Sequence, residues 1–265
     1  MLKFIPGFPA LMAGGSLVLA DLHIGLEHEL FGKGLRVGSQ MREMLSHVAK
    51  LIEEYAPERV VFLGDVKHNV PDTPYGETRD LAVFFDEVSA LASVVVTPGN
   101  HDGNLGRYVR SSNVEISLAG GFTSDSCSYL HGHAWPSEEA MSKNTIIMAH
   151  QHPCVELVDK LGGRSILKAW CIGGFSSEAR ERYPGLKKGA KCVIVPSFNP
   201  LTGGAVLNRS PHDGVHGPLM NKKIFKLDES KIYLLDGTPL GSVKSLTRKG
   251  ASGAGGIFNG KQKRK

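Results

Sequence analysis

The stretch "FLGDVKHNV", residues 62–70, places a carboxylate directly after a buried strand. The apolar residues 60–63 predict a strand that is covered on both faces, and this strand ends at Gly64, with Asp65 next. A carboxylate in this position lowers stability unless a positive group lies against it. The identity of that positive group is the first question that the rest of the sequence must answer.

The composition is that of an ordinary globular protein. Of the 265 residues, 41% are hydrophobic and 22% are charged, enough to bury a sizeable core. We expect no signal peptide and no membrane association, because no cationic start precedes an apolar run and no segment has the ~20 apolar residues that span a bilayer. The four cysteines are widely spaced, which predicts reduced, buried thiols and a cytoplasmic protein (Cys127, Cys154, Cys171 and Cys192).

The net charge of +5 originates in the C-terminal segment. Residues 243–265 hold seven of the 31 lysines and arginines and no acidic residue, so the preceding residues carry 24 basic side chains against 26 acidic ones. The segment is also rich in glycine, which predicts a disordered basic tail after a globular domain of residues 1–242. Such a tail is expected to act as a solubilising end or to contact nucleic acid weakly and without sequence preference.

Short apolar strands alternate with amphipathic helices in the first half of the chain. One helix is predicted over residues 41–55, with Ser39 as its cap and Pro57 beyond its end, and a second helix is predicted from Thr78 to residue 91. This alternation predicts an α/β fold, and the additional strands and turns of the second half predict a mixed sheet in one domain. The main predicted strands cover residues 17–20, 60–63, 94–97, 145–149, 192–195 and 232–235.

Polar side chains follow five of the apolar runs, the fifth being residues 128–130. Because ligands of open α/β sheets bind outside the carboxyl ends of the strands, these groups are expected to point at one place. Each fragment alone is weak, since an isolated histidine is more often a satisfied core residue than a ligand. Together they are hard to explain as structural residues, because many buried polar groups would gather without compensation. The residues are Asp21 and His23, then Asp65, then Asn100, His101 and Asp102, then His131 and His133, and finally His150 and His152.

This nitrogen and oxygen donor set, without a thiolate, predicts a metal site. It suits Mn, Fe, Zn, Ni or Mg rather than a structural zinc site. There are too many donors for one ion, and two ions ~3.5–4 Å apart need a carboxylate that reaches both of them. We therefore predict that Asp65 faces two divalent ions and bridges them.

The fragments "ADLHIG", "LGD", "PGNHD", "LHGH" and "AHQHP" together resemble the calcineurin-like metallophosphoesterase superfamily. They match its D-x-H, G-D, G-N-H-D, H and G-H-x-H motifs in order over residues 17–153. The stretch "PSFNPLTGG", residues 196–204, resembles a prokaryotic branch that includes the DNA-ligase-associated phosphoesterases. The resemblance implies a four-layer α/β/β/α sandwich of two mixed sheets, with a dimetal site at the carboxyl ends of the strands.

The resemblance also implies a role for each matched residue. One ion would be held by Asp21, His23, Asp65 and His152, and the second by Asp65, Asn100, His131 and His150. His101 would donate a hydrogen bond or a proton to the leaving oxygen, and Asp102 would fix the tautomer of His101. The attacking group would be a water or hydroxide that bridges the ions.

The sequence departs from the family pattern in two places. Ala149 replaces the usual glycine, which is harmless unless that position needs a positive φ. Both His131 and His133 are present where one ligand is needed. We assign His131 as the ligand because it directly follows the strand, and His133 as a neighbour of the ligands or a contact to substrate. His68 is a further candidate for substrate binding or a surface histidine, and Arg164, Trp170 and Asn199 are weaker pocket candidates.

The leading functional hypothesis is a dimetal phosphoesterase, with Mn as the preferred metal, that hydrolyses a phosphodiester of a nucleotide or nucleic acid. A phosphomonoesterase and a cyclic-nucleotide phosphodiesterase are the alternatives. A nucleic-acid-binding module does not explain the donor set, and an inactive scaffold does not explain why every motif position is filled.

Overall fold

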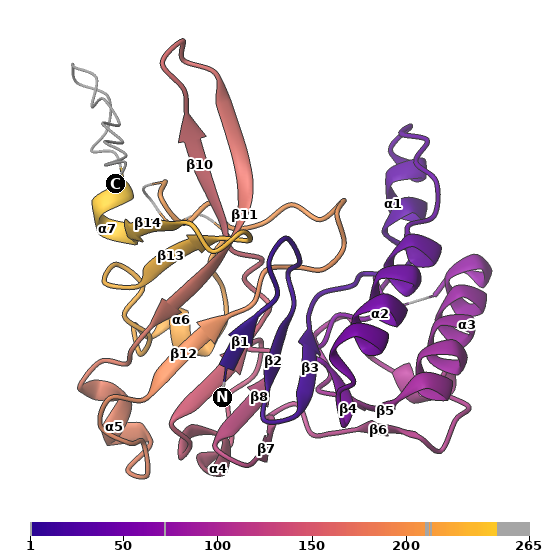
Figure 1. The fold of residues 1–265 in the computed structure, drawn as a ribbon, viewed down its shortest axis with the longest axis horizontal. Coiled ribbons are helices and arrows are strands. Elements are labelled where there is room, and N and C mark those ends of the chain that lie inside the picture. Colours follow the sequence, from indigo (N-terminus) through magenta and orange to yellow (C-terminus); the bar gives the residue numbers. More distant parts are fainter. Residues whose placement is uncertain (1, 72, 210–211, 213, 248–265) are drawn as a thin grey trace.

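Two β-sheets form the middle of the molecule, and helices cover the outer face of each sheet (Figure 1). The computed structural model describes residues 2–71, 73–209, 212 and 214–247. The first sheet runs in the order β1-β2-β3-β4-β5-β6, with β1 (Leu2–Phe4), β2 (Leu11–Ala13), β3 (Ser16–Leu19), β4 (Arg59–Phe62), β5 (Ser93–Val96) and β6 (Val114–Ile116).

The second sheet runs in the order β14-β13-β11-β12-β9-β8-β7, and β10 pairs with β11 outside this path. Both sheets are mixed, because β3 to β6 are parallel and so are β8, β9 and β12, while antiparallel strands lie at their sides. The strands are β7 (Phe122–Ser124), β8 (Cys127–Leu130), β9 (Thr145–Met148), β10 (Cys154–Val158), β11 (Arg164–Gly173), β12 (Lys191–Ile194), β13 (Lys231–Leu234) and β14 (Pro239–Ser242).

The apolar runs form strands that are buried on both faces, as in other covered parallel sheets. In β4 and the residue after it, Val60 and Phe62 pack against the helices, whereas Val61 and Leu63 pack against the opposite sheet. The predicted four-layer α/β/β/α sandwich is confirmed. The helices on the side of the first sheet are α1 (Leu26–Gly32), α2 (Met41–Tyr55) and α3 (Tyr75–Leu91). The helices on the side of the second sheet are α4 (Glu138–Met141), α5 (Glu178–Arg182), α6 (Pro218–Asn221) and α7 (Val243–Leu246). Leu105–Arg107 form a 3₁₀ turn.

Three predicted helix and tail boundaries differ from the structure. The residue that caps α2 is Gln40 rather than Ser39, although the Ser39 Oγ accepts a bond of 3.3 Å from the backbone N–H of Met41. Helix α3 begins at Tyr75, ahead of the predicted Thr78, because Pro74 ends the preceding extended segment. Helix α7 lies inside the predicted tail, and its Val243 is fully buried, so the ordered chain extends past residue 242. Residues 248–265 of that tail lie outside the described residues.

The prediction that the four cysteines are unpaired and buried agrees with the structure. All four cysteines are free and buried. Among the helices of the described residues, none is long and apolar enough to cross a membrane.

Candidate dimetal site

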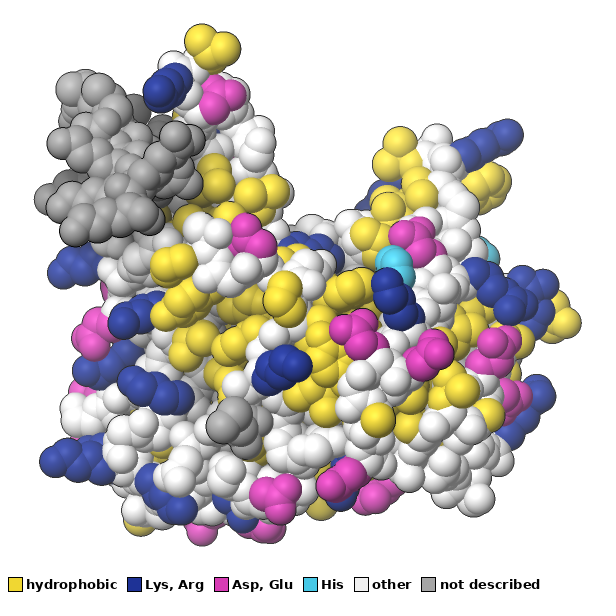
Figure 2. Space-filling view, in the orientation of Figure 1, with side chains coloured by type: hydrophobic (Ala, Val, Ile, Leu, Met, Phe, Trp, Pro, Cys, Tyr) yellow, Lys and Arg dark blue, Asp and Glu magenta, His cyan; other side chains and the backbone are white. Residues whose placement is uncertain are grey.

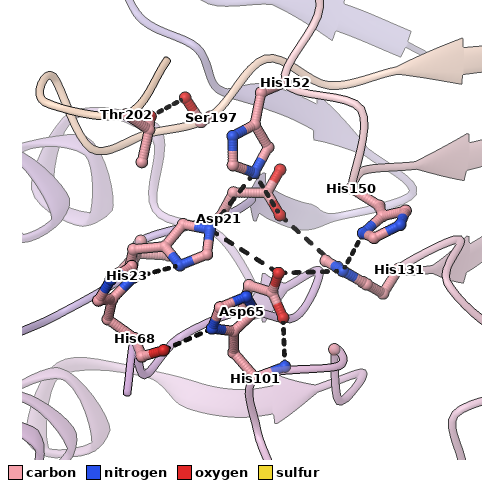
Figure 3. A network of polar contacts seen from close by, with 12 residues as sticks. Asp21, His23, Asp65, His68, His101, His131, His150, His152, Ser197 and Thr202 are labelled. Atoms are coloured by element: carbon pink, nitrogen blue, oxygen red, sulfur yellow. Dashed lines mark hydrogen bonds and ion pairs between the residues drawn. The ribbon is translucent and has the colours of Figure 1, made fainter. Parts of the chain in front are cut away.

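Loops after six strands meet at one end of the two sheets. The strands β3, β4 and β5 are parallel neighbours in one sheet, and β8, β9 and β12 are parallel in the other. Their carboxyl ends therefore open toward the same region, where Figure 3 shows the aspartates and histidines pointing at one another.

The four residues predicted to bind the first ion lie together. Asp21, His23, Asp65 and His152 each offer one ligand atom, and these atoms lie within 4.8 Å of one another. The Nε2 atoms of His23 and His152 are 3.4 Å apart, and Asp21 Oδ1 is 3.4 Å from His152 Nε2. Asp65 Oδ2 completes the group at 3.7 Å from His23 Nε2.

A second group consists of Asp65, His131 and His150. His131 Nε2 is 3.4 Å from Asp65 Oδ2 and 3.1 Å from His150 Nδ1. The other ring nitrogen of His131 donates to the Leu63 carbonyl over 2.7 Å, which leaves the lone pair on Nε2, facing the group. Asp65 is common to both groups, as expected of a bridging ligand.

The geometry favours His131 over His133 as the metal ligand. The His133 ring centroid lies 5.2 Å from that of His131 and 6.2 Å from that of His150, so His133 stands behind the donors. Its Nδ1 is buried, without a hydrogen-bond partner in the described part of the chain. A contact of His133 with substrate stays a prediction.

The donor spacing fits divalent ions. Two donor atoms about 2.1 Å from one ion, at right or tetrahedral angles, lie about 3.0–3.4 Å from each other. The neighbouring donor atoms of the two groups lie 3.1 to 3.7 Å apart. Both carboxylate oxygens of Asp21 are buried and accept no hydrogen bond from the described residues. A carboxylate left in this condition is costly without a cation, so the residues present fit a metal centre.

The backbone at this site is unusual as well. Five predicted ligands have a positive φ, which non-glycine residues adopt rarely and often at functional sites: Asp21 (53°), His23 (43°), Asp65 (46°), His150 (70°) and His152 (42°). Ala149 is not among the positive-φ residues of the described chain, so its replacement of the family's glycine is harmless.

The remaining predicted ligand, Asn100, is less well placed. It is exposed in the turn after β5, and its side chain has no hydrogen bond within the described residues. Its neighbour His101 is closer to the centre, since the backbone N–H of His101 donates to Asp65 Oδ1 over 2.9 Å. The role of Asn100 as a ligand therefore stays a prediction.

The predicted pairing of Asp102 with the His101 ring is wrong. His101 Nδ1 instead contacts the backbone carbonyl of His68. Asp102 is buried, and its carboxylate accepts backbone bonds from Val66 (2.9 Å), Lys67 (3.1 Å) and Gly99 (2.8 Å). Because adjacent residues in this turn project in different directions, the Asp102 carboxylate joins the loop after β4 to the turn after β5. The His101 imidazole is oriented by the backbone carbonyl of His68.

His68, a further candidate for substrate binding, lies beside the first donor group. Its Nδ1 lies 3.2 Å from Nδ1 of His23, and its Nε2 lies 2.5 Å from Oε2 of Glu29. Both ring nitrogens are therefore engaged by protein groups. His68, His23 and His101 form a third group of close ring nitrogens. Within this group, both nitrogens of His68 and the Nδ1 of His101 are already engaged in contacts with the protein.

Two buried carboxylates hold the loop that follows the bridging aspartate. Asp102 accepts the N–H groups of residues 66 and 67, and Glu77 accepts those of His68 (2.8 Å) and Asn69 (3.1 Å). The turn after β5 approaches so closely that a Cβ on Gly99 would lie 2.1 Å from Asp65 Oδ1. Only glycine fits there, which explains the glycine of the "GNHD" fragment.

The "PSFNPLTGG" loop supports the first group from the opposite sheet. Asn199 is fully buried and donates to the carbonyls of Leu22 (2.8 Å) and His23 (3.3 Å). The Gly203 carbonyl accepts from His152 Nδ1 over 3.1 Å, which leaves the lone pair of His152 on Nε2. Asn199 is thus a structural anchor and not a pocket residue. Trp170 is likewise buried between the sheets, and Arg164 pairs with Glu156 at the surface.

The protonation of the donors is uneven. Burial lowers the pKa of His23 to about 3 and that of His150 to about 4, so both rings are neutral at pH 7. Burial also opposes protonation of His131, but the charge and hydrogen bond of Asp65, with Asp21, raise its pKa to about 9. Desolvation disfavours the charged form of Asp65, yet His131 holds the pKa of Asp65 below its usual range. Without metal, the positive charge of protonated His131 balances part of the negative charge of Asp65 and Asp21.

We predict that metal binding at pH 7 releases a proton. The raised pKa means that His131 is protonated below about pH 9 and must lose its proton to become a ligand, so metal affinity should fall as the pH falls. Isothermal titration of the apoprotein with Mn²⁺ in buffers of different ionisation enthalpy measures this release. Buffer-independent heats at pH 7 would show that His131 is neutral or is not a ligand.

With the geometry established, sequence comparison gives the family. The model of the calcineurin-like phosphoesterases matches residues 16–228. The chain belongs to this family and is a metal-dependent hydrolase that acts on phosphoric ester bonds. The family is dimetal-dependent, in agreement with the two groups of donors. No curated protein matches the chain.

Solved structures include similar folds. The nuclease MPE of Pseudomonas putida is 19% identical, covers 91% of this chain and 100% of its own, and has a TM-score of 0.56, which shows a shared fold. YfcE, a phosphoesterase from E. coli, is 17% identical over 54% of this chain and 73% of its own, with a TM-score of 0.34. A Vps29 double mutant from Entamoeba histolytica is 14% identical over 71% and 79%, with a TM-score of 0.32.

Proposed function

We propose that the protein hydrolyses a phosphodiester of a nucleotide or nucleic acid, using two divalent ions, with manganese as the preferred metal. The observation that carries the proposal is the position of Asp65 in both donor groups. The first ion would be held by Asp21, His23, Asp65 and His152, and the second by Asp65, Asn100, His131 and His150. When bound, the ions would polarise the phosphoryl oxygens and activate water as the nucleophile.

The residues of the chain supply the remaining parts of this mechanism. His101 is partly exposed, and the carbonyl of His68 accepts from its Nδ1. The opposite nitrogen, Nε2, has no partner among the described side chains and is available to a leaving oxygen, to which we assign a hydrogen bond or proton from His101. His133, whose ring adjoins those of His131 and His150, is assigned as a contact to the phosphoester group.

The shape of the surface supports an extended substrate. Helix α1 begins three residues after His23, and β10 begins two residues after His152, so both elements rise from ligand loops. Figures 1 and 2 show that α1 and the β10–β11 hairpin stand up on either side of a hollow. An open hollow between two arms accommodates a strand of nucleic acid better than a closed pocket would. A nuclease is among the proteins with this fold, and the buried free thiols support a cytoplasmic location.

The proposal is tested with a substrate panel. Mn²⁺-loaded protein would be assayed with nitrophenyl mono- and diesters, cyclic nucleotides, single-stranded DNA and nicked DNA. Faster hydrolysis of the diester and the DNA than of the monoester and cyclic nucleotides is the expected result. A clear preference for the monoester or for a cyclic nucleotide would replace the proposed substrate class with that alternative.

The basic tail is predicted to affect nucleic-acid contact but not catalysis. Residues 248–265 hold six basic side chains and no acidic one, so their deletion should weaken low-salt DNA binding and leave nitrophenyl diester hydrolysis almost unchanged. Gel-shift and rate measurements check both effects. A deletion from residue 243 is the matched control, since loss of the buried Val243 should also lower the melting temperature. Loss of diester hydrolysis after deletion of 248–265 would place the tail in the fold or the site.

A further inference from the structure

A row of three side chains leads from the first donor group to helix α1. The ring of His68 lies between His23 and Glu29, with Nδ1 3.2 Å from His23 Nδ1 and Nε2 2.5 Å from Glu29 Oε2. Figure 3 shows His68 beside His23, on the side away from His131 and His150. The His68 side chain is only 11% exposed, whereas Glu29 is 39% exposed and also contacts Lys33 one helical turn later.

Metal binding determines where the protons lie along this row. His23 faces the donor group through Nε2, so an ion bound there needs the Nε2 lone pair, and the proton of His23 must be on Nδ1. That N–H then donates to Nδ1 of His68, whose own proton lies on Nε2. The last group in the row is a carboxylate, which accepts the Nε2–H of His68. With an ion on His23 Nε2, this arrangement gives every donor along the row an acceptor.

We propose that His68 and Glu29 are positioning residues, which hold His23 in the tautomer and orientation that bind the first metal ion. This inference rests on the proposed function. A hydrogen-bond acceptor behind a ligating histidine orients the ring and makes it more basic, and loss of such partners typically costs about 10–100-fold in metal affinity. Here that acceptor is His68, which Glu29 orients in turn.

Substitution of His68 or Glu29 should lower the affinity for the first ion and leave the affinity for the second ion unchanged. The other supported ligands hydrogen-bond to backbone carbonyls, His131 to that of Leu63 and His152 to that of Gly203, which side-chain substitutions do not remove. Among the described ligands, His23 is the one whose second nitrogen meets another side chain. Because Glu29 belongs to α1, the row also connects the first ion to one arm beside the hollow.

The test is isothermal titration of apoprotein variants with Mn²⁺. His68→Phe keeps a ring of similar bulk but removes the acceptor, and we expect it to weaken one ion by about 10–100-fold and leave the other unchanged. His68→Asn, whose Oδ1 can accept from His23, should restore part of that affinity. Glu29→Gln should weaken the same ion by a smaller factor, since it keeps an acceptor and loses the charge. Glu87→Gln, an exposed glutamate paired with Arg42, is the matched control and should bind as the wild type does.

Several results would overturn the inference. Unchanged binding of both ions by His68→Phe and Glu29→Gln would show that the row does not position His23. Equal weakening of both ions, with a lower melting temperature of the apoprotein, would show a general structural role. Failure of the wild type to bind two Mn²⁺ ions would instead refute the proposed dimetal function, so the two failures are distinguishable.

Discussion

Replacing Asp65 by asparagine is expected to remove both metal ions from the purified protein. Asp65 is the residue that both donor groups share, so neither proposed ion keeps its full ligand set without the carboxylate. Asparagine tolerates the positive φ of 46° at this position about as well as aspartate does, so the loop should keep its course. The loss should therefore reflect the missing charge and oxygen rather than a disrupted backbone.

The hydrogen bonding around Asp65 decides how an asparagine would sit. Asp65 Oδ1 accepts the backbone N–H of His101 over 2.9 Å, whereas Oδ2 faces His131 and His23 at 3.4 and 3.7 Å. The amide oxygen must take the place of Oδ1, because an NH₂ group there would oppose a donor with a donor. The NH₂ group then lies between the two ion positions, where it cannot act as a ligand.

Elemental analysis of the purified variant measures this outcome. We expect a fall from about two ions per chain toward none, together with loss of diester hydrolysis. Asp80→Asn is the matched control, since Asp80 is also buried but lies on α3, where its carboxylate accepts hydrogen bonds from Ser39 and Arg79. Normal metal content and intact activity in Asp65→Asn would remove Asp65 from its central role.

Local sequence patterns predict the α/β class and the meeting of the polar side chains, whereas the four-layer sandwich and the ligand assignments follow from the family resemblance. Apolar runs of four residues predict covered strands, and parallel strands deliver whatever follows them to one edge. Asp65, His131 and His150 are found together for that reason, although they are far apart in the chain.

The supporting contacts were not predictable in the same way. The family resemblance implies that Asp102 fixes the tautomer of His101, yet the direction of each side chain depends on the turn, which no sequence pattern specifies. Glu29 and Glu77 lie on helices and match no motif, so their contacts with His68 emerge only when the helices are placed. Glu29 follows the D-x-H motif closely in the sequence, whereas Glu77 is far from every motif histidine.

Replacing His101 by alanine should separate metal binding from chemistry. The backbone N–H of residue 101, which holds Asp65, survives the substitution, so metal content should stay normal. The imidazole is lost, and with it the free Nε2 that is assigned to the leaving oxygen. Turnover of a diester with an alkyl or ribose leaving oxygen should fall by ~10²–10⁴-fold, the usual contribution of a general acid.

The size of the loss should depend on the leaving group, and this dependence identifies the role. Nitrophenolate needs little protonation, so nitrophenyl diester hydrolysis should fall much less in His101→Ala than hydrolysis of a poor-leaving-group diester. Asp102→Asn is the contrasting variant, because its carboxylate accepts three backbone N–H groups and an amide would turn a donor toward at least one of them. It should lower the melting temperature and the activity on both substrates alike. A His101→Ala protein with full metal and unimpaired turnover of the poor-leaving-group diester would refute the role assigned to His101, because no step would then depend on its imidazole.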